Sequence, residues 1–457
     1  MASEIRVNKI ENRSGLGTVT FADTGVDLAG IVTATTFSGS GASLTGLPAA
    51  QLSGTLPALD GSALTGVAST ENIRTNTNAT FLQNVNVSGS TTTGTTIVGG
   101  GVTISESGIE ASGIGITCAN INGTQIGGRR NIIINGDMRI AQRGTSSTSD
   151  GYQTVDRFQV NSFGTDEAPT QERFVTSSSD TGPWQEGFRN ALKITNGNQT
   201  GGAGTSDFIR ILYYVEAQDL ANSGWDYTNP NSYITLSYWV KSSVAQTYYT
   251  NFRTFDGTGK MYYFSYDLSA ETWTKIIHSI PGHADLTFSN DTGQGMYIQW
   301  YMYRGTNNTG TVTANQWNNY ASSTLTPDQT TTWYVTNDAA FRLTGVQLEV
   351  GSQATPFEHR SFGEELSLCQ RYYYRINSTD NTIIMFNDYN NSTGNFWANV
   401  VFPVTMRSAP TATITSLEGS GVSLSSSTSS VHMLNLQSGD GAMYIGNSTI
   451  VEASAEL

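Results

Sequence analysis

Aromatic side chains in loop-like contexts have the clearest binding chemistry in this sequence. Glycine and polar residues surround each of six such rings, which are Trp184, Trp225, Tyr227, Trp317, Tyr320 and Tyr389. Rings of this kind stack on the apolar faces of sugars, while polar neighbours bond the hydroxyl groups. The set therefore predicts a saccharide- or receptor-binding surface. The alternative is that loop tryptophans cap the ends of a β-sandwich or pack against a neighbouring chain.

Catalytic residues are not indicated by any pattern in the chain. A glycoside hydrolase needs two carboxylates about 5 to 10 Å apart, and no spacing singles out a pair among Asp156, Glu172, Asp207, Glu216 and Asp226. The four histidines are scattered, at His278, His283, His359 and His432. GxSxG, HExxH and phosphate-cradling motifs are absent from the sequence. We therefore predict a protein that is not an enzyme.

The charge and hydropathy of the chain exclude several partners. A net charge of −14 opposes binding to nucleic acid or to an anionic membrane, since both need a basic surface. Apolar runs fall short of the roughly 20 residues that span a bilayer, so we expect no membrane insertion. The first residues, MASEIRVNKIENRSG, lack the apolar core of a signal peptide, which favours release by cell lysis. Cys118 and Cys369 predict free thiols rather than a disulfide framework.

The elements that position the candidate rings are predicted to be strands. Only 13% of the 457 residues are charged, and 48 are glycine, which favours an all-β fold. Ten strand-like runs occur within residues 131–360, which predicts an antiparallel β-sandwich. The apolar residues Ile132–Ile134 suggest that its first strand is buried on both sides. Several runs are apolar on both faces, so much of the sheet must be covered.

Residues 1–130 differ sharply from the rest. Of 47 aromatic residues, only Phe21, Phe37 and Phe81 precede position 131, too few for the core of a monomer. GASLTGL at 41–47 returns as GSALTGV at 61–67. We interpret 1–67 as an attachment and stalk segment and 68–130 as a β-rich shaft, formed by intertwined chains. The alternative is a flexible linker.

The segment Phe341 to Arg375 is predicted to couple two domains. A slip of the apolar phase at Gly345 indicates a β-bulge in a long strand. Ser361 and Glu364 fit a capping box that begins a connecting helix within 361–375. One helical face would carry Phe362, Leu366, Cys369 and Tyr373. We expect Phe362, Leu366 and Tyr373 to lie at a trimer interface, ahead of a small β-sandwich tip at 376–457.

Several stretches of the chain carry a resemblance to a known family. They include SEIRVNKIENRSGLGTVTFADTG and GIVTATTFSGSGASLTGL near the N-terminus, NGDMRIAQRGTS with YQTVDRF after position 131, VQLEVG, ATPFEHRSFGEELSLCQRYYYR, FPVTMRSAPTATI and the terminal EASAEL. The chain resembles tail fibre proteins of tailed bacteriophages, especially cyanophages. The resemblance implies a trimeric shaft, a jelly roll similar to carbohydrate-binding modules, and a tip that touches the host. A structural calcium is compatible with this fold, but the sequence lacks a DxDxDG-type run. We therefore assign no metal ligand and expect no cofactor.

The sequence and the resemblance together predict a homotrimeric tail fibre that acts as a receptor-binding adhesin. Its partners would be a host cell-surface glycan or protein and, through the N-terminus, a tail or baseplate protein. Its place would be the virion tail, which is extracellular after host lysis. The alternatives are a fibre-bound polysaccharide depolymerase and a purely structural virion spacer. Whether the jelly roll or the tip contacts the host stays open at this point.

Overall fold

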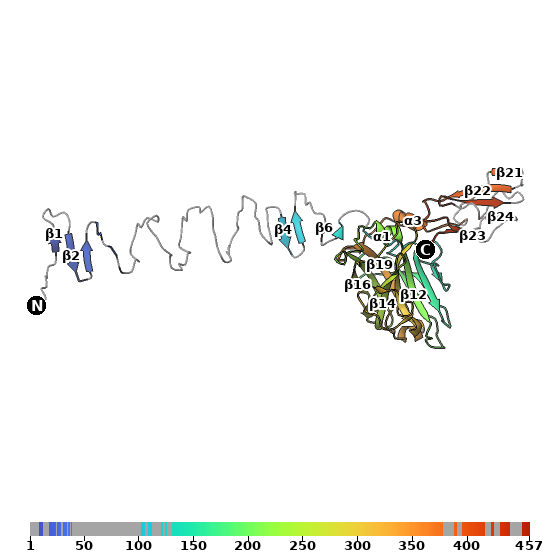
Figure 1. Cartoon of the computed structure of the whole chain (residues 1–457), viewed down its shortest axis with the longest axis horizontal. Coiled ribbons are helices and arrows are strands. Elements are labelled where there is room, and N and C mark those ends of the chain that lie inside the picture. The colour runs from blue at the N-terminus through green and yellow to red at the C-terminus, as the bar shows by residue number, and fades with distance from the viewer. Residues whose placement is uncertain are drawn as a thin grey trace. The chain divides into compact units, whose positions relative to one another are not determined.

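The computed structural model describes residues 9–11, 18–23, 25–28, 31–33, 35–36, 38, 102–105, 108–111, 120–121, 124–125, 130–377, 388–390, 395–415, 422–424, 430–438 and 450–457. The chain divides into two compact units, residues 1–99 and 100–457. Strands far outnumber helices in both units, which confirms the all-β class (Figure 1). None of the described helices has the length and apolar character needed to cross a membrane.

The described strands of the first unit form one antiparallel sheet. Its strands are β1 (Lys9–Glu11), β2 (Thr18–Ala22) and β3 (Gly25–Leu28). The second unit begins with two hairpins, β4 (Val102–Ser105) with β5 (Gly108–Ala111), and β6 (Asn120–Ile121) with β7 (Thr124–Gln125). The repeat at 41–47 and 61–67, Phe37, Phe81 and Cys118 lie outside the described residues. The stalk and the shaft therefore stay predictions.

Two six-stranded antiparallel sheets follow, and they form the predicted sandwich (Figure 1). The first sheet has the order β16 (Thr274–Pro281), β13 (Tyr233–Ser242), β19 (Ala340–Val350), β11 (Asn190–Thr195), β10 (Thr170–Val175), β8 (Ser146–Ser147). The second sheet has the order β18 (Asn318–Asn319), β15 (Lys260–Leu268), β14 (Gln246–Thr254), β17 (Gln294–Arg304), β12 (Phe208–Glu216), β9 (Phe158–Phe163). Short helices α1 (Ala217–Ala221), η3 (Thr306–Asn308) and α2 (Thr332–Val335) lie in the connections.

The core lies between the two sheets and is unusually aromatic. Alternate side chains of each strand point inward, as the two-residue period of a strand requires. Trp300 of β17 and Tyr238 of β13 are fully buried, with ring centroids 5.8 Å apart in an edge-on arrangement. Such aromatic pairs contribute about 0.5–1.5 kcal/mol beyond the area they bury.

The bulge predicted at Gly345 is confirmed. The pairing of β13 with β19 shifts between Ser237 and Trp239, and Gly345 has a φ of +63°. A Cβ at this glycine would lie 2.7 Å from the ring of Phe188, so no other residue fits without rearrangement. The extra residue brings Val346 and the strand beyond it back into phase with the core.

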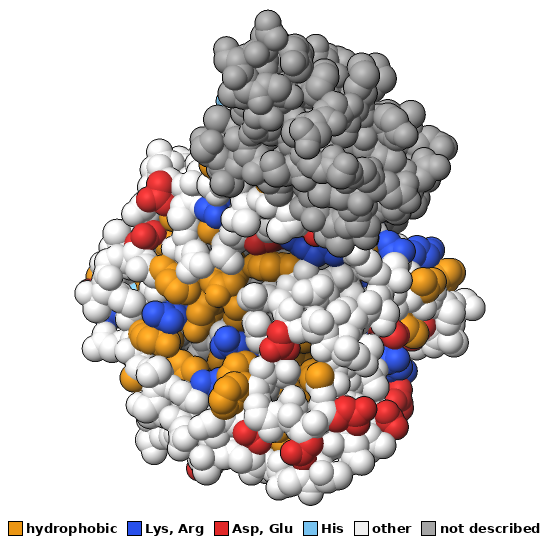
Figure 2. Space-filling model, turned by 90° about the vertical axis from the view of Figure 1, so that its right-hand side faces the viewer, with side chains coloured by type: hydrophobic (Ala, Val, Ile, Leu, Met, Phe, Trp, Pro, Cys, Tyr) orange, Lys and Arg blue, Asp and Glu red, His pale blue; other side chains and the backbone are white. Residues whose placement is uncertain are grey.

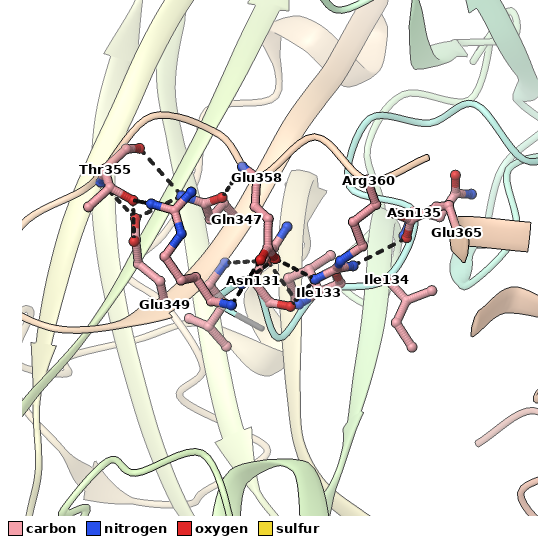
Figure 3. Close-up of polar contacts among 12 residues, drawn as sticks. Asn131, Ile133, Ile134, Asn135, Gln347, Glu349, Thr355, Glu358, Arg360 and Glu365 are labelled. Atoms are coloured by element: carbon pink, nitrogen blue, oxygen red, sulfur yellow. Dashed lines mark hydrogen bonds and ion pairs between the residues drawn. The ribbon is translucent and has the colours of Figure 1, made fainter. Parts of the chain in front are cut away.

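The first residues of the sandwich are bonded to its last ones, as Figure 3 shows. Arg360 donates to the carbonyl oxygens of Asn131 and Ile133, and its guanidinium pairs with Glu358 at 2.8 Å and Glu365 at 3.4 Å. Glu365 in turn accepts from the amide of Asn135 at 2.5 Å. The chain at Ile132–Ile134 is buried as expected, but it is not a strand, because these side-chain groups take the place of ladder partners.

The predicted connecting helix is α3 (Phe362–Gln370). The hydroxyl of Ser361 accepts from the amide of Glu364 at 3.2 Å, which confirms the Ser361 part of the capping box. The helix is shorter than its apolar pattern suggested. Tyr373 lies beyond it, in strand β20 (Tyr373–Asn377). The prediction that Tyr373 lies on the helical face is therefore wrong.

The strands described after α3 form two small sheets. One has the order β20, β26 (Ile450–Ser454), β23 (Thr411–Thr415), and the other β21 (Asp388–Asn390), β22 (Asn395–Val401), β25 (Met433–Ser438), β24 (Val422–Leu424). Contacts of the C-terminal residues connect this region to the sandwich. Ala455 donates to Tyr372 O at 2.7 Å, and Glu456 pairs with the buried Arg157.

Candidate functional site

The outer face of the second sheet carries an unusual set of side chains. Core residues alternate along β12, β14 and β17, so the intervening residues point away from the core. A surface of this kind is ordinarily dominated by small polar and charged groups. Here the outward set is instead tyrosine, phenylalanine, arginine and amide, namely Phe208, Arg210, Tyr214, Tyr249, Asn251, Arg253, Tyr297, Gln299, Tyr301 and Arg304. We refer to this set as the aromatic–arginine face.

Strand register arranges these side chains in cross-strand rows. One row reads Tyr249, Tyr301, Arg210, the next Asn251, Gln299, Leu212, and the third Arg253, Tyr297, Tyr214. A fourth row joins Arg304, Phe208 and Phe163 at the far end of the strands. Residues opposite each other in such rows are close enough for their side chains to touch. The register thus places a row of amides between two rows that contain arginine.

Each arginine of this face lies against aromatic rings. The guanidinium carbon of Arg253 is 3.6 Å from the ring centroid of Tyr320 and 4.7 Å from that of Phe255. Arg210 and Arg304 lie 4.8 Å and 4.6 Å from the ring of Phe208. A stacked guanidinium is held in place by the ring. The Nε atoms of these three arginines are buried and have no hydrogen-bond partner within the described residues.

The central row contains buried amide atoms without a partner. Asn251 Oδ1 and Gln299 Nε2 are both buried and form no hydrogen bond within the described residues. The other ends of these amides are held, since Asn251 donates to Leu325 O at 3.1 Å and Gln299 accepts from the hydroxyl of Tyr301. Leaving such a group unpaired costs about 1–3 kcal/mol. Both side chains are 0% exposed, so the central row is a buried polar layer, and the accessible part of the face consists of its half-buried tyrosines and arginines.

The segment after β17 crosses one side of the face. The hydroxyl of Tyr263 donates to Val312 O at 3.0 Å, and Tyr320 reaches the guanidinium of Arg253. The other side, over β12 and β9, is more open, and Phe163 there is 58% exposed. The aromatic–arginine face is therefore bounded on the β15 side and accessible from the β9 side.

Positive charge on this face is not neutralised by an ion pair within the described residues, although the exposed Asp267 lies near Tyr249. Among the described residues, none of Arg210, Arg253 and Arg304 forms an ion pair with a carboxylate. Burial, together with the neighbouring charge of Arg210, lowers the pKa of Arg304. Figure 2 shows a face on which hydrophobic side chains gather with basic ones among them, while acidic side chains lie mostly nearer its margin.

Two of the predicted loop rings belong to the core. Trp225 is 3% exposed, and its indole donates to Ser232 O at 3.3 Å. Trp317 is 8% exposed and donates to Pro281 O at 2.7 Å. Neither ring offers a free face, because the hydrophobic cluster at the end of the sandwich surrounds both. The prediction of these two as ligand-stacking residues is corrected in favour of the capping alternative.

The other predicted rings are dispersed. Trp184 is half-buried, with the guanidinium carbon of Arg189 3.7 Å from its ring centroid. Tyr227 packs edge-on against Phe288 at 5.0 Å. Tyr320 alone joins the aromatic–arginine face, through Arg253. The backbone of Tyr389 lies in β21, and its side chain lies outside the described residues.

The expected trimer-interface residues have different surroundings. Phe362 is 59% exposed, as an interface residue of a single chain would be. Leu366 packs partly against a small cluster of its own chain that includes Cys369 and Tyr372. Tyr373 is 3% exposed, and its hydroxyl donates to Glu452 at 2.5 Å. Its own chain buries Tyr373, so that residue is removed from the interface prediction.

The carboxylates weighed for catalysis have partners in the fold. Glu216 pairs with Arg371 at 2.9 Å and Glu172 with Lys193 at 3.1 Å. Asp156 is bonded to Gln142, and burial raises its pKa to about 6. Within the part of the chain that the structure describes, no group of three or more acidic, histidine or cysteine side chains is placed to hold a metal ion.

Sequence reasoning missed the aromatic–arginine face, although its signal was present. Strands such as MYIQWYMYR and TYYTNFRT carry large side chains at both odd and even positions. One set fills the core, and the other set faces outward. Large outward side chains indicate that either a covering layer or a ligand packs on them. The expectation that several strands are apolar on both faces and that much of the sheet is covered was correct, since Asn251, Gln299 and Tyr301 of the outward set are 0% exposed.

Comparison with known proteins gives only distant similarities. No family model and no curated protein matches the chain. The enzymatically active domain of tailspike protein 4 of bacteriophage CBA120 has a TM-score of 0.26 at 10% identity, covering 48% of this chain and 21% of that one. A putative sugar binding protein of Bacteroides thetaiotaomicron has a TM-score of 0.26 at 10% identity, covering 48% and 99%. A family 11 carbohydrate-binding module of Clostridium thermocellum has a TM-score of 0.22 at 12% identity, covering 47% and 98%.

The matched part thus spans about a fifth of the tailspike structure and nearly all of the two sugar-binding ones. Similarity of fold does not transfer an activity or a ligand, because unrelated functions share the same architectures. The chemistry of this chain's own surface has to carry the functional conclusion.

Proposed function

We propose that the sandwich binds saccharide through the aromatic–arginine face. The observation that carries this proposal is the pairing of half-buried rings with half-buried guanidiniums, because Tyr249 shares a cross-strand row with Arg210 and Tyr214 shares one with Arg253. Rings that stack on sugar faces and polar groups that bond hydroxyls are the two components of saccharide recognition. The face supplies both on rigid strands.

In this proposal the saccharide is on a host cell, and the chain is a tail fibre of a tailed bacteriophage. The sequence resemblance at NGDMRIAQRGTS and VQLEVG supports the fibre role. The chain assembles as a homotrimer in the virion tail, with residues 1–130 as stalk and shaft and the N-terminus on a tail or baseplate protein. Three copies of one weak site then act together, because linked sites raise avidity without new contacts.

The proposed site binds without cutting. No carboxylate of the described residues is ion-paired with an arginine of the aromatic–arginine face, and the weighed acidic residues Glu172 and Glu216 have basic partners elsewhere. Incubation with a bound polysaccharide should therefore release no reducing ends. Release that grows with time would replace this proposal with the depolymerase alternative.

A glycan array tests saccharide binding directly. The full-length chain is applied to immobilised bacterial surface polysaccharides, alongside the variants Tyr249→Ala and Tyr233→Ala. Tyr249 lies on the aromatic–arginine face, whereas Tyr233 is an equally half-buried tyrosine on the outer face of the first sheet. We expect Tyr249→Ala to weaken binding and Tyr233→Ala to leave it unchanged. Equal binding by both variants would remove the aromatic–arginine face from the proposal.

The fibre role has its own test in the mass of the protein in solution. Light scattering of the full-length chain should give three times the monomer mass of 49.1 kDa. A monomer would contradict the trimeric stalk, since residues 1–130 then have too few large side chains for a core.

A further inference from the structure

We infer that the saccharide bound by the aromatic–arginine face is an anionic polymer, whose sugar units carry carboxylate, sulfate or phosphate groups. This inference rests on the proposed saccharide-binding function and names the class of ligand. It follows from the charges and their spacing.

The first step is the absence of an ion pair between the arginines of this face and any described carboxylate. Arg210, Arg253 and Arg304 stack on rings rather than on carboxylates, in a chain with a net charge of −14 that has acidic groups to spare. Arg304 is only 9% exposed. A buried cation is stable when an anion approaches it, and a guanidinium presents a fork that matches carboxylate, sulfate and phosphate oxygens.

The second step is the proximity of two like charges. Arg210 and Arg304 are close enough for each other's charge to matter, and this lowers the pKa of Arg304 in addition to the effect of burial. Two neighbouring guanidiniums without a carboxylate repel each other. An anion bound between them relieves this repulsion, so the free face is arranged for an anion rather than for a neutral group.

The third step is the spacing along the strands. On β17, the row of Arg253 passes through Tyr297 and the row of Arg210 through Tyr301. Four residues separate these rows, which is about 13 Å of extended chain. A single sugar ring does not span that length, whereas a polymer with repeated anionic groups meets both rows at once.

The experiment uses the full-length chain and an array that holds neutral and acidic bacterial polysaccharides, with polyglutamate as a polyanion without sugar. We expect binding to acidic polysaccharides only. On the tightest of these, Arg210→Gln and Arg253→Gln should each weaken binding about tenfold or more, because each removes charge-assisted hydrogen bonds. Lys193→Gln, which removes a cation from the outer face of the first sheet, should have no effect. Arg210→Lys should recover only part of the loss.

The wild-type protein supplies a second measurement that needs no variant. Binding should weaken as salt is raised from 50 to 500 mM, because exposed charge–charge attraction is screened. Binding to neutral polysaccharides, with no effect of salt or of the arginine variants, would overturn the anionic inference and leave saccharide binding intact. Equal binding of polyglutamate would overturn it as well. Binding to no polysaccharide at all would remove the proposed function together with the inference.

Discussion

The two outer faces of the sandwich carry similar numbers of cations in opposite settings. On the first sheet, Lys193, Arg342 and Lys241 form one cross-strand row. Lys193 pairs with Glu172 at 3.1 Å. Glu271 pairs with both Arg342, at 3.6 Å, and Lys241, at 2.9 Å. On the second sheet, the arginines of the aromatic–arginine face have aromatic neighbours and no carboxylate among the described residues.

The cations of that row on the first sheet are therefore neutralised within the chain, whereas the arginines of the aromatic–arginine face have no ion-pair partner in the part of the chain that the structure describes. Cations paired within the chain gain little from a further anion, since their charge is already compensated. Unpaired cations that are partly buried keep their full attraction for an anion. The contrast exists on two sheets of one domain, so each face serves as the control for the other.

The largest effect is expected where paired charges are most buried, in the network of Figure 3. Arg360→Met leaves Glu365 buried without its cation and removes the donors to Asn131 and Ile133. Because a buried charge then lacks compensation, we expect a loss of about 3–5 kcal/mol in the free energy of unfolding. Urea denaturation measures it. The exposed Arg189→Met is the control, and an equal loss for both variants would contradict the role of the network.

A somewhat smaller effect is expected at the bulge that keeps β19 in register. Gly345→Val places a side chain against the ring of Phe188 at a position with φ of +63°. Strain and overpacking together should cost about 3 kcal/mol. The melting temperature measures this, with Gly363→Val as the control, since a Cβ at Gly363 meets nothing within 4 Å. A melting temperature equal to that of wild type would show that the bulge does not fix the register.

The interior between the two sheets disfavours a charged side chain. The dependence of stability on the protonation of His278 tests this. Burial lowers the pKa of His278 to about 4, and its ring stacks on Phe264 at 4.0 Å. Since the unfolded state binds a proton near pH 6.5, stability is present above that pH and is lost as the pH falls towards 4. After allowance for partial exposure, His278 should contribute about 1–2 kcal/mol to this loss.

Denaturation at pH 7 and pH 4.5 measures the effect of His278. The loss should shrink in His278→Phe and persist in the control His283→Gln, because the side chain of His283 is 40% exposed. An identical loss in wild type and His278→Phe would show that other groups cause it.

The smallest predicted effect is a difference in stability between one variant on each outer face. Lys275→Gln breaks the pair with Glu186 at 2.9 Å and should cost up to about 1 kcal/mol, as exposed pairs do. Arg210→Gln breaks no ion pair and reduces repulsion with Arg304, so stability should stay within about 0.5 kcal/mol of wild type or rise. Thermal unfolding of both variants checks the sign. A larger loss for Arg210→Gln would mean that this arginine is structural.

Much of the fold followed from local patterns, whereas the site did not. The slip at Gly345 and the Ser361 cap were readable because each depends on neighbours in sequence. Trp225 and Trp317 were misplaced because a turn-like context does not show which way a ring points. The aromatic–arginine face depends on register among β12, β14 and β17, which join residues about 40 to 90 positions apart. A single sequence holds no signal for that pairing.

The central claim is that the aromatic–arginine face contacts the saccharide. Hydroxyl-radical footprinting of the full-length chain, with and without a polysaccharide that binds on the array, tests it most directly. The account predicts protection of Tyr249, Tyr214 and Phe163 on the second sheet, with Tyr233 and Trp239 on the first sheet unchanged. Protection confined to residues 376–457 or to the first sheet, with Tyr249 unaffected, would contradict it.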